Sequence, residues 1–175
     1  MAVDAFIWFK SSRLGSALEG DTKDEIFSKE KAFEIKDFSF GIENPTTIGS
    51  ATGGAGAGKI KFNEFTIKRT TDKASPLFFK NCCVGAHYDT VTIAIRKAGG
   101  SAATPDREYL RFSFSTVFTT KIDWSGPGDE GPEESITFVF GKLAVKFTPP
   151  EPGSKPVQAG WDQVLNRETS DLADR

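Results

Sequence analysis

A long stretch near the middle of the chain alternates between apolar and polar residues, and this alternation constrains the fold more than any other feature. From Leu110 to Trp124 the even positions are mostly Leu, Phe, Ile or Trp, and the odd positions are mostly Ser, Thr, Arg or Lys. Neighbouring side chains of a β-strand point to opposite faces. The pattern therefore predicts a long strand with one apolar and one polar face.

Further strands are predicted at residues 3–9, 33–42 and 87–98. Two other stretches change the parity of their apolar positions, near Asn63-Glu64 and near Gly141-Lys142. One inserted residue in a strand, a β-bulge, has this effect, so we expect strongly bent strands there. The fold class predicted from these patterns is mainly β.

The first predicted strand is apolar on both faces. Ile7 and Phe9 lie on one side, and Phe6 and Trp8 lie on the other. Such a strand must be covered twice, by the protein's own core and by a helix or another subunit. We therefore take Phe6 and Trp8 as candidate interface residues.

One helix interrupts the strands. Ser75 is a candidate N-cap, Pro76 suits the first helical position, and Gly85 suits a left-handed stop after Val84. Four helical positions fall in a single sector, which predicts that the helix lies against the sheets or plugs a barrel end; they are Phe78, Phe79, Cys82 and Cys83.

Length and composition predict one domain over residues 1–175, with a Gly-rich extended loop at 46–59 and a Pro-rich spacer at 149–160. The formal charge of −2 gives no bulk attraction to nucleic acid, and no apolar run is long enough to insert in a membrane. The N-terminus lacks the features of a cleaved signal peptide, and adjacent Cys82 and Cys83 favour reduced thiols and cytoplasmic assembly.

The sequence offers only weak candidates for a phosphate-binding, catalytic or metal site. The segment from Gly53 to Lys59 resembles a phosphate-binding loop, but Ile60 stands where Ser or Thr would hold magnesium, and a strand pattern follows instead of a helix. His87 with the cysteines does not have the setting of a catalytic thiol or the spacing of a zinc site. We predict no catalytic residue, no cofactor and no metal.

Four acidic residues fall in a Gly- and Pro-rich turn, and we interpret them as a solvated hairpin; they are Asp129, Glu130, Glu133 and Glu134. The polar face of the long strand lacks the interleaved aromatic residues of a nucleic-acid surface. We interpret it as a water-facing sheet surface.

Several short motifs, in their order along nearly the whole chain, resemble the hemolysin-coregulated protein (Hcp) family, the inner-tube subunits of bacterial type VI secretion systems. The N-terminal segment Met1 to Ile7 is one. The others include Phe38 to Gly41, Asp72 to Leu77, Cys83 to His87, Ile95 to Gly100, and Gly160-Trp161-Asp162 with Asn166.

The resemblance implies a two-sheet β-barrel flanked by one α-helix, with hexameric rings stacked into a hollow tube. It implies no enzymatic activity. It also implies partners: a spike protein at the tube tip, contractile sheath proteins, and small effector proteins in the lumen. The subunit is then secreted without a cleaved signal peptide.

By position, the loop that the family docks on an adjacent subunit corresponds to the Gly-rich loop here, which adds candidate interface residues Ile48, Gly53, Gly54 and Lys59. The polar face of the long strand supplies candidate lumen-facing residues Arg111, Ser113, Ser115 and Lys121. Two alternatives stay open: a monomeric β-barrel that binds a small apolar ligand among its Phe residues, and, less favoured, an enzyme.

Overall fold

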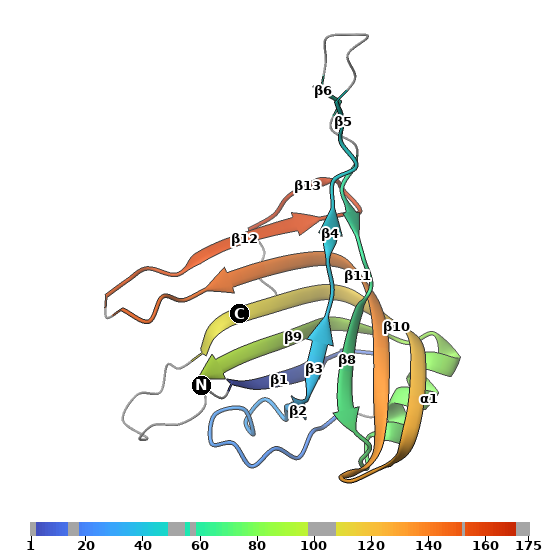
Figure 1. The fold of residues 1–175 in the computed structure, drawn as a ribbon. Coiled ribbons are helices and arrows are strands. Elements are labelled where there is room, and N and C mark those ends of the chain that lie inside the picture. The colour runs from blue at the N-terminus through green and yellow to red at the C-terminus, as the bar shows by residue number, and fades with distance from the viewer. Residues whose placement is uncertain are drawn as a thin grey trace.

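A computed structural model describes residues 3–13, 18–48, 55–56, 59–97, 108–151 and 153–170. Within these ranges the chain forms strands and one helix (Figure 1). The helix is α1 (Ser75–Val84). The strands are β1 (Val3–Lys10), β2 (Phe33–Ile35), β3 (Asp37–Ser39), β4 (Ile42–Glu43), β5 (Thr47–Ile48), β6 (Ala55–Gly56), β7 (Lys61–Phe62), β8 (Phe65–Thr70), β9 (His87–Lys97), β10 (Glu108–Gly128), β11 (Gly131–Phe147), β12 (Val157–Asp162) and β13 (Arg167–Glu168).

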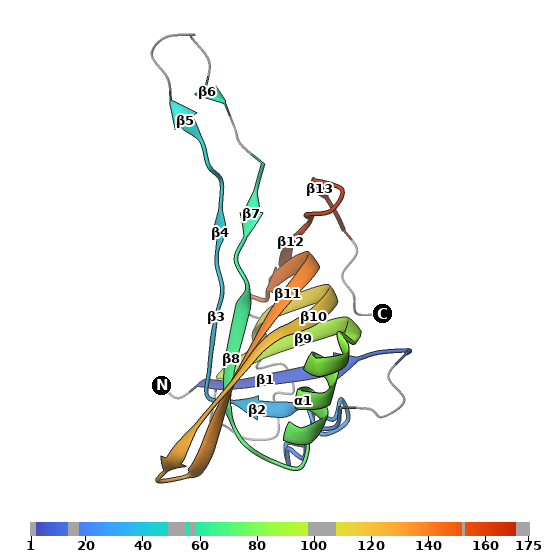
Figure 2. The ribbon, with the colours of Figure 1, turned by 90° about the vertical axis from the view of Figure 1, so that its right-hand side faces the viewer.

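The largest sheet has the order β13-β12-β11-β10-β9-β1-β2, and its neighbouring strands are antiparallel. On the edge that faces away from β10, the first part of β11, Glu133–Phe138, pairs with β8, and β8 pairs with β3. The second part, Lys142–Phe147, pairs with β12. The long strands β10 and β11 therefore bend and belong to both layers (Figure 2).

The two layers make a barrel that no continuous ladder closes in the described part of the chain. β2 pairs with β1 in one layer and β3 pairs with β8 in the other. The chain itself joins these layers at Lys36, whose amide donates to the Lys68 carbonyl. The predicted mainly β, two-sheet architecture with one helix is confirmed. At this corner the chain passes directly from β2 to β3, so the two layers are joined through the backbone and not by strand pairing.

Aromatic side chains fill the space between the layers. Phe65 is fully buried and stacks on Phe114 and Phe138, with ring centroids 4.2 and 4.7 Å apart. Phe78 and Tyr88 are also fully buried. The barrel interior is therefore packed with the protein's own rings, which removes the basis for a small apolar ligand inside it.

The predicted parity change near Gly141 is confirmed, because Phe140 and Leu143 are both buried. The facing strand changes parity at the same level, which the sequence interpretation missed. There Phe114 and Val117 are both buried, and Thr116 between them has φ 55°.

The pairing register does not slip across this point, so no residue is inserted here as the bulge interpretation required. Instead, the left-handed backbone of Thr116 reverses which side chains of β10 point into the barrel. Beyond it the predicted apolar face fails, since Phe118 is exposed and Thr119 is buried. A register shift does occur slightly farther along, between Thr119 and Lys121.

The predicted helix is confirmed, with corrections at its start and on its packed side. Ala74 occupies the N-cap position without a side-chain cap, so the prediction of Ser75 as N-cap is wrong. Gly85 ends the helix at φ 64°, as predicted. Phe78 is buried, but Phe79 and Cys83 are exposed, so these two do not pack on the sheets.

A narrow two-stranded arm projects from the barrel above the sheets (Figures 1 and 2). Pairing of β4 with β7 forms its root, and pairing of β5 with β6 continues it. The inserted residue predicted near Asn63-Glu64 is confirmed, because the pairing shifts by one residue between Phe38↔Ile67 and Ile42↔Phe62, where the chain breaks between β7 and β8. The predicted strand at 33–42 is broken into β2, β3 and the start of β4.

Candidate self-assembly surfaces

The second apolar face of β1 is covered by the chain itself. Phe6 and Trp8 are only 2% and 3% exposed. Phe27 stacks on Phe6 with a centroid separation of 4.4 Å and lies 5.8 Å from the Trp8 ring. We call residues 18–32 the covering segment. The structure thus corrects the assignment of Phe6 and Trp8 as interface residues, because this segment leaves them almost no surface.

Charged groups fix the covering segment to the sheet. Asp24 accepts hydrogen bonds of 3.0 Å from the amides of Ile26 and Phe27, and its carboxylate pairs with Arg96 of β9. Burial works to raise the pKa of Asp24, but these hydrogen bonds outweigh it and hold the pKa below its ordinary value of 3.8. The Arg96 guanidinium also lies 5.1 Å from the Phe6 ring centroid. The segment is therefore clamped by both charge and aromatic contact.

The candidate loop residues fall partly outside the described ranges. Gly53 and Gly54 lie outside them. Ile48 belongs to β5, and Lys59 is exposed at the start of the returning chain. The arm therefore carries the described part of this loop away from the barrel (Figure 2).

The candidate lumen-facing residues do not form one exposed row. Arg111 is held by Glu108 and its guanidinium lies 5.5 Å from the Trp8 ring centroid, whereas Ser113 is only 3% exposed. Ser115 is half-buried, and Lys121 is exposed beside Asp123 at 3.0 Å. Ser113 therefore offers almost no surface to a partner, and Lys121 lies beyond the parity change at Thr116.

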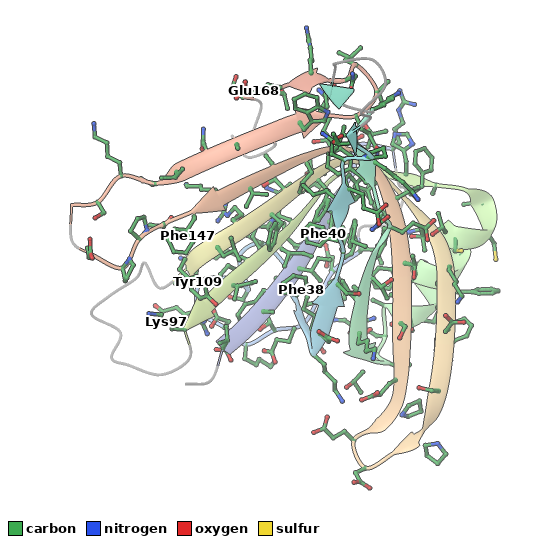
Figure 3. All side chains as sticks on the ribbon, turned by 45° about the horizontal axis from the view of Figure 1, so that its top comes forward. Phe38, Phe40, Lys97, Tyr109, Phe147 and Glu168 are labelled. Atoms are coloured by element: carbon green, nitrogen blue, oxygen red, sulfur yellow. The ribbon has the colours of Figure 1, made fainter. Side chains whose placement is uncertain are left out.

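Exposed apolar side chains gather at two ends of the protomer, and the sequence interpretation missed both groups. One group lies on α1 and the adjoining part of β10, where Phe79 packs 6.1 Å from Trp124. The other lies at the opposite ends of the strands of the large sheet, where Phe147 pairs with Val157 and lies 6.3 Å from Tyr109 (Figure 3). In the sequence, large apolar residues at the ends of the predicted strands could have indicated these two groups.

The acidic turn is only partly solvated. Asp129 and Glu130 are exposed, but Glu134 is 1% exposed, so its interpretation as a solvated residue is wrong. Its carboxylate pairs with buried Arg69 and accepts a 3.0 Å hydrogen bond from the Trp124 indole. These contacts join β8, β10 and β11, and a buried ion pair that loses one partner is strongly destabilising.

His87 and the two cysteines belong to no metal-binding cluster in the described ranges. His87 lies 3.7 Å from Asp89, and no group of three or more His, Cys, Asp or Glu side chains there is placed to hold a metal ion. No helix in the same ranges is long and apolar enough to cross a membrane.

Comparison with known proteins identifies the family. The family described as type VI secretion system effector, Hcp, matches residues 6–147. Protein hcp1 of Pseudomonas aeruginosa is 30% identical over 109 residues, an alignment that spans 59% of this chain and 65% of that protein, just under two thirds of its length.

Solved structures share the fold. Hcp1 from Salmonella typhimurium has a TM-score of 0.73 at 22% identity, over 97% of this chain and all of that one. A type six secretion system protein reaches 0.81 at 22% identity, over 96% of this chain and 100% of that one. A type VI secretion system effector from Yersinia pestis gives 0.68 at 24% identity, over 91% and 99%. The chain belongs to the Hcp family of type VI secretion system proteins.

Proposed function

We propose that this chain is a non-enzymatic structural subunit of the type VI secretion tube. Six copies form a ring, and the rings stack into a hollow tube that leaves the cell. Membership of the Hcp family supports this assignment. The observation that carries it in the structure is the pair of exposed apolar groups at opposite ends of one protomer.

Opposite apolar ends suit a head-to-tail ring. A contact between two different surfaces repeats from copy to copy, and it closes when the rotation between neighbours divides a full turn. Large exposed apolar patches on a soluble protein mark contacts with other molecules. A ring buries both groups on every subunit, which a symmetric dimer does not.

The outer face of the large sheet is the candidate wall of the bore. Arg111 and Ser115 of β10 lie on this face. Their pairing partners on β11 are Lys146 and Lys142, which lie on the same face. Their polar and charged groups keep such a wall hydrated. We propose that small effector proteins pass through this bore.

The proposed function also includes the other components of the secretion system and the route of export. A spike protein caps the tube and contractile sheath proteins surround it. Assembly takes place in the cytoplasm, and export needs no cleaved signal peptide. The exposed arm, with Ile48 and Lys59 in its described part, is the candidate contact between neighbouring subunits or stacked rings.

Light scattering coupled to size exclusion tests self-assembly. We expect a mass of about 114 kDa, six copies of 19.0 kDa. A single 19.0 kDa species at every concentration contradicts the proposal. Deleting residues 53–58 should keep rings and reduce their stacking in electron micrographs, and rings that stack as well as the wild type exclude that role for the loop.

A further inference from the structure

In the described part of the chain, the second layer does not extend over one end of the large sheet. β8, which belongs to that layer, pairs with β11 only along Glu133–Phe138. Beyond it, the inner face of β11 and β12 lies against the root of the arm, where Phe62 contacts Phe140 with a centroid separation of 5.6 Å. A shallow groove of about 260 Å³ remains there, lined almost wholly by apolar side chains; they are Ile42, Ile60, Phe62, Leu143, Val145, Ala159, Gly160 and Trp161.

The apolar face continues from this groove to the ends of the strands. Phe147 lies two residues after Val145 on the same face of β11, and Val157 is its partner on β12. Val157 is 68% exposed, and Phe147 is also exposed. We call the groove together with Phe147 and Val157 the seat. A sheet face of this kind is stable in water only when another layer covers it.

The opposite end of the protomer carries three exposed apolar side chains, Phe79, Val84 and Trp124, which we call the ridge. These side chains are 52%, 64% and 51% exposed. Phe79 and Val84 project from α1, and Trp124 stands beside them on β10. Figure 1 places α1 at the end of the barrel farthest from the first residues of β12.

We propose that the seat of one subunit receives the ridge of a second copy of this chain, with Phe79 entering the groove. This inference rests on the proposed function, because it requires self-association. An apolar cavity of about 150 Å³ is known to hold a benzene ring, so a groove of about 260 Å³ has room for one aromatic side chain. The ridge supplies the layer that the end of the large sheet lacks, and the opposite positions of ridge and seat make the contact head-to-tail.

Crosslinking between a native and an introduced cysteine tests this pairing. Cys83 is exposed next to Val84 on the ridge. In a Cys82→Ser background, Val157→Cys places a second thiol at the seat, and Val164→Cys provides a matched control. Val164 is likewise an exposed valine, at 75%, but it follows the other end of β12.

With a short bismaleimide, the Val157→Cys protein should give a ladder of crosslinked chains, and adding Cys83→Ser should abolish it. The Val164→Cys protein should give no ladder. If light scattering shows assembled rings and the Val157→Cys protein gives no ladder, or the control gives an equal one, the pairing is refuted while the proposed function stands. If no assembly forms at all, the proposed function itself fails.

A second measurement does not depend on crosslinking. Phe79→Glu should shift the protein to the 19.0 kDa species with little change in its own thermal unfolding, because this side chain is half exposed in the protomer. Val164→Glu should keep the assembly. Intact rings in the Phe79→Glu protein also refute the inference.

Discussion

Removal of the Phe27 ring is the most direct test of the covering segment. Phe27 is 3% exposed, while its neighbour Ile26 is 42% exposed. Replacing a buried Phe by Ala costs about 3 to 5 kcal/mol, and stacked aromatic pairs contribute further. The covering segment lies at the edge of the fold and can partly collapse into the space, so we expect the low end, about 3 kcal/mol.

The assay is urea unfolding followed by tryptophan fluorescence, with all proteins at one concentration because assembly adds to apparent stability by mass action. For a chain of this size, about 3 kcal/mol corresponds to a fall in Tm of roughly 6 to 12 °C. Ile26→Ala should cost less than about 1 kcal/mol, since much of its side chain is already in water. Equal losses for Phe27→Ala and Ile26→Ala refute the reasoning.

Three further predictions concern the same fold. Gly20→Ala places a Cβ 2.0 Å from a backbone carbonyl oxygen and should lower Tm, whereas Gly41→Ala, whose nearest neighbour is 3.4 Å away, should cost far less. Glu134→Gln removes one of the two carboxylates that pair with buried Arg69, the other being Asp72, and should destabilise the protein by up to about 3 kcal/mol in urea titrations. The pKa of Asp24 is lowered on folding, so its contribution is complete at neutral pH and is lost as pH falls below about 4. Unfolding curves should therefore show a smaller acid-induced loss for Asp24→Asn than for the wild type.

The alternation of apolar and polar residues predicted the strands well. The observed β1, β9 and β10 contain the ranges expected from the sequence almost residue for residue. The failure at Thr116 has a physical reason. Its φ of 55° is rarely adopted by a β-branched residue, and no residue type at that position announces it. The parity change in the facing strand was visible because its apolar residues themselves shift, from even positions up to Phe140 to odd positions from Leu143.

The covering segment shows a second limit of sequence reasoning. A doubly apolar β1 correctly indicated two layers of cover, but it did not tell which molecule supplies the second. The answer depends on Phe27, one of the few apolar residues in a mostly polar stretch with no periodicity. Its effect comes from tertiary contacts with Phe6 and from Asp24, which holds the turn in place. Isolated side chains of this kind carry no pattern that a sequence alone reveals.

The positions of the remaining apolar surfaces separate two kinds of contact. The arm leaves the barrel crosswise to the strands of the large sheet, whereas the ridge and the seat lie at the two ends of those strands (Figures 1 and 2). Contacts through the strand ends extend the assembly in one direction, and contacts through the arm extend it in another. Changes at Phe79 and deletion of residues 53–58 should then act independently, because distant sites without shared partners add in free energy, whereas changes at Ile42 or Phe62 in the root of the arm also alter the seat. A subunit built this way can close a ring before it stacks, since neither contact needs the other.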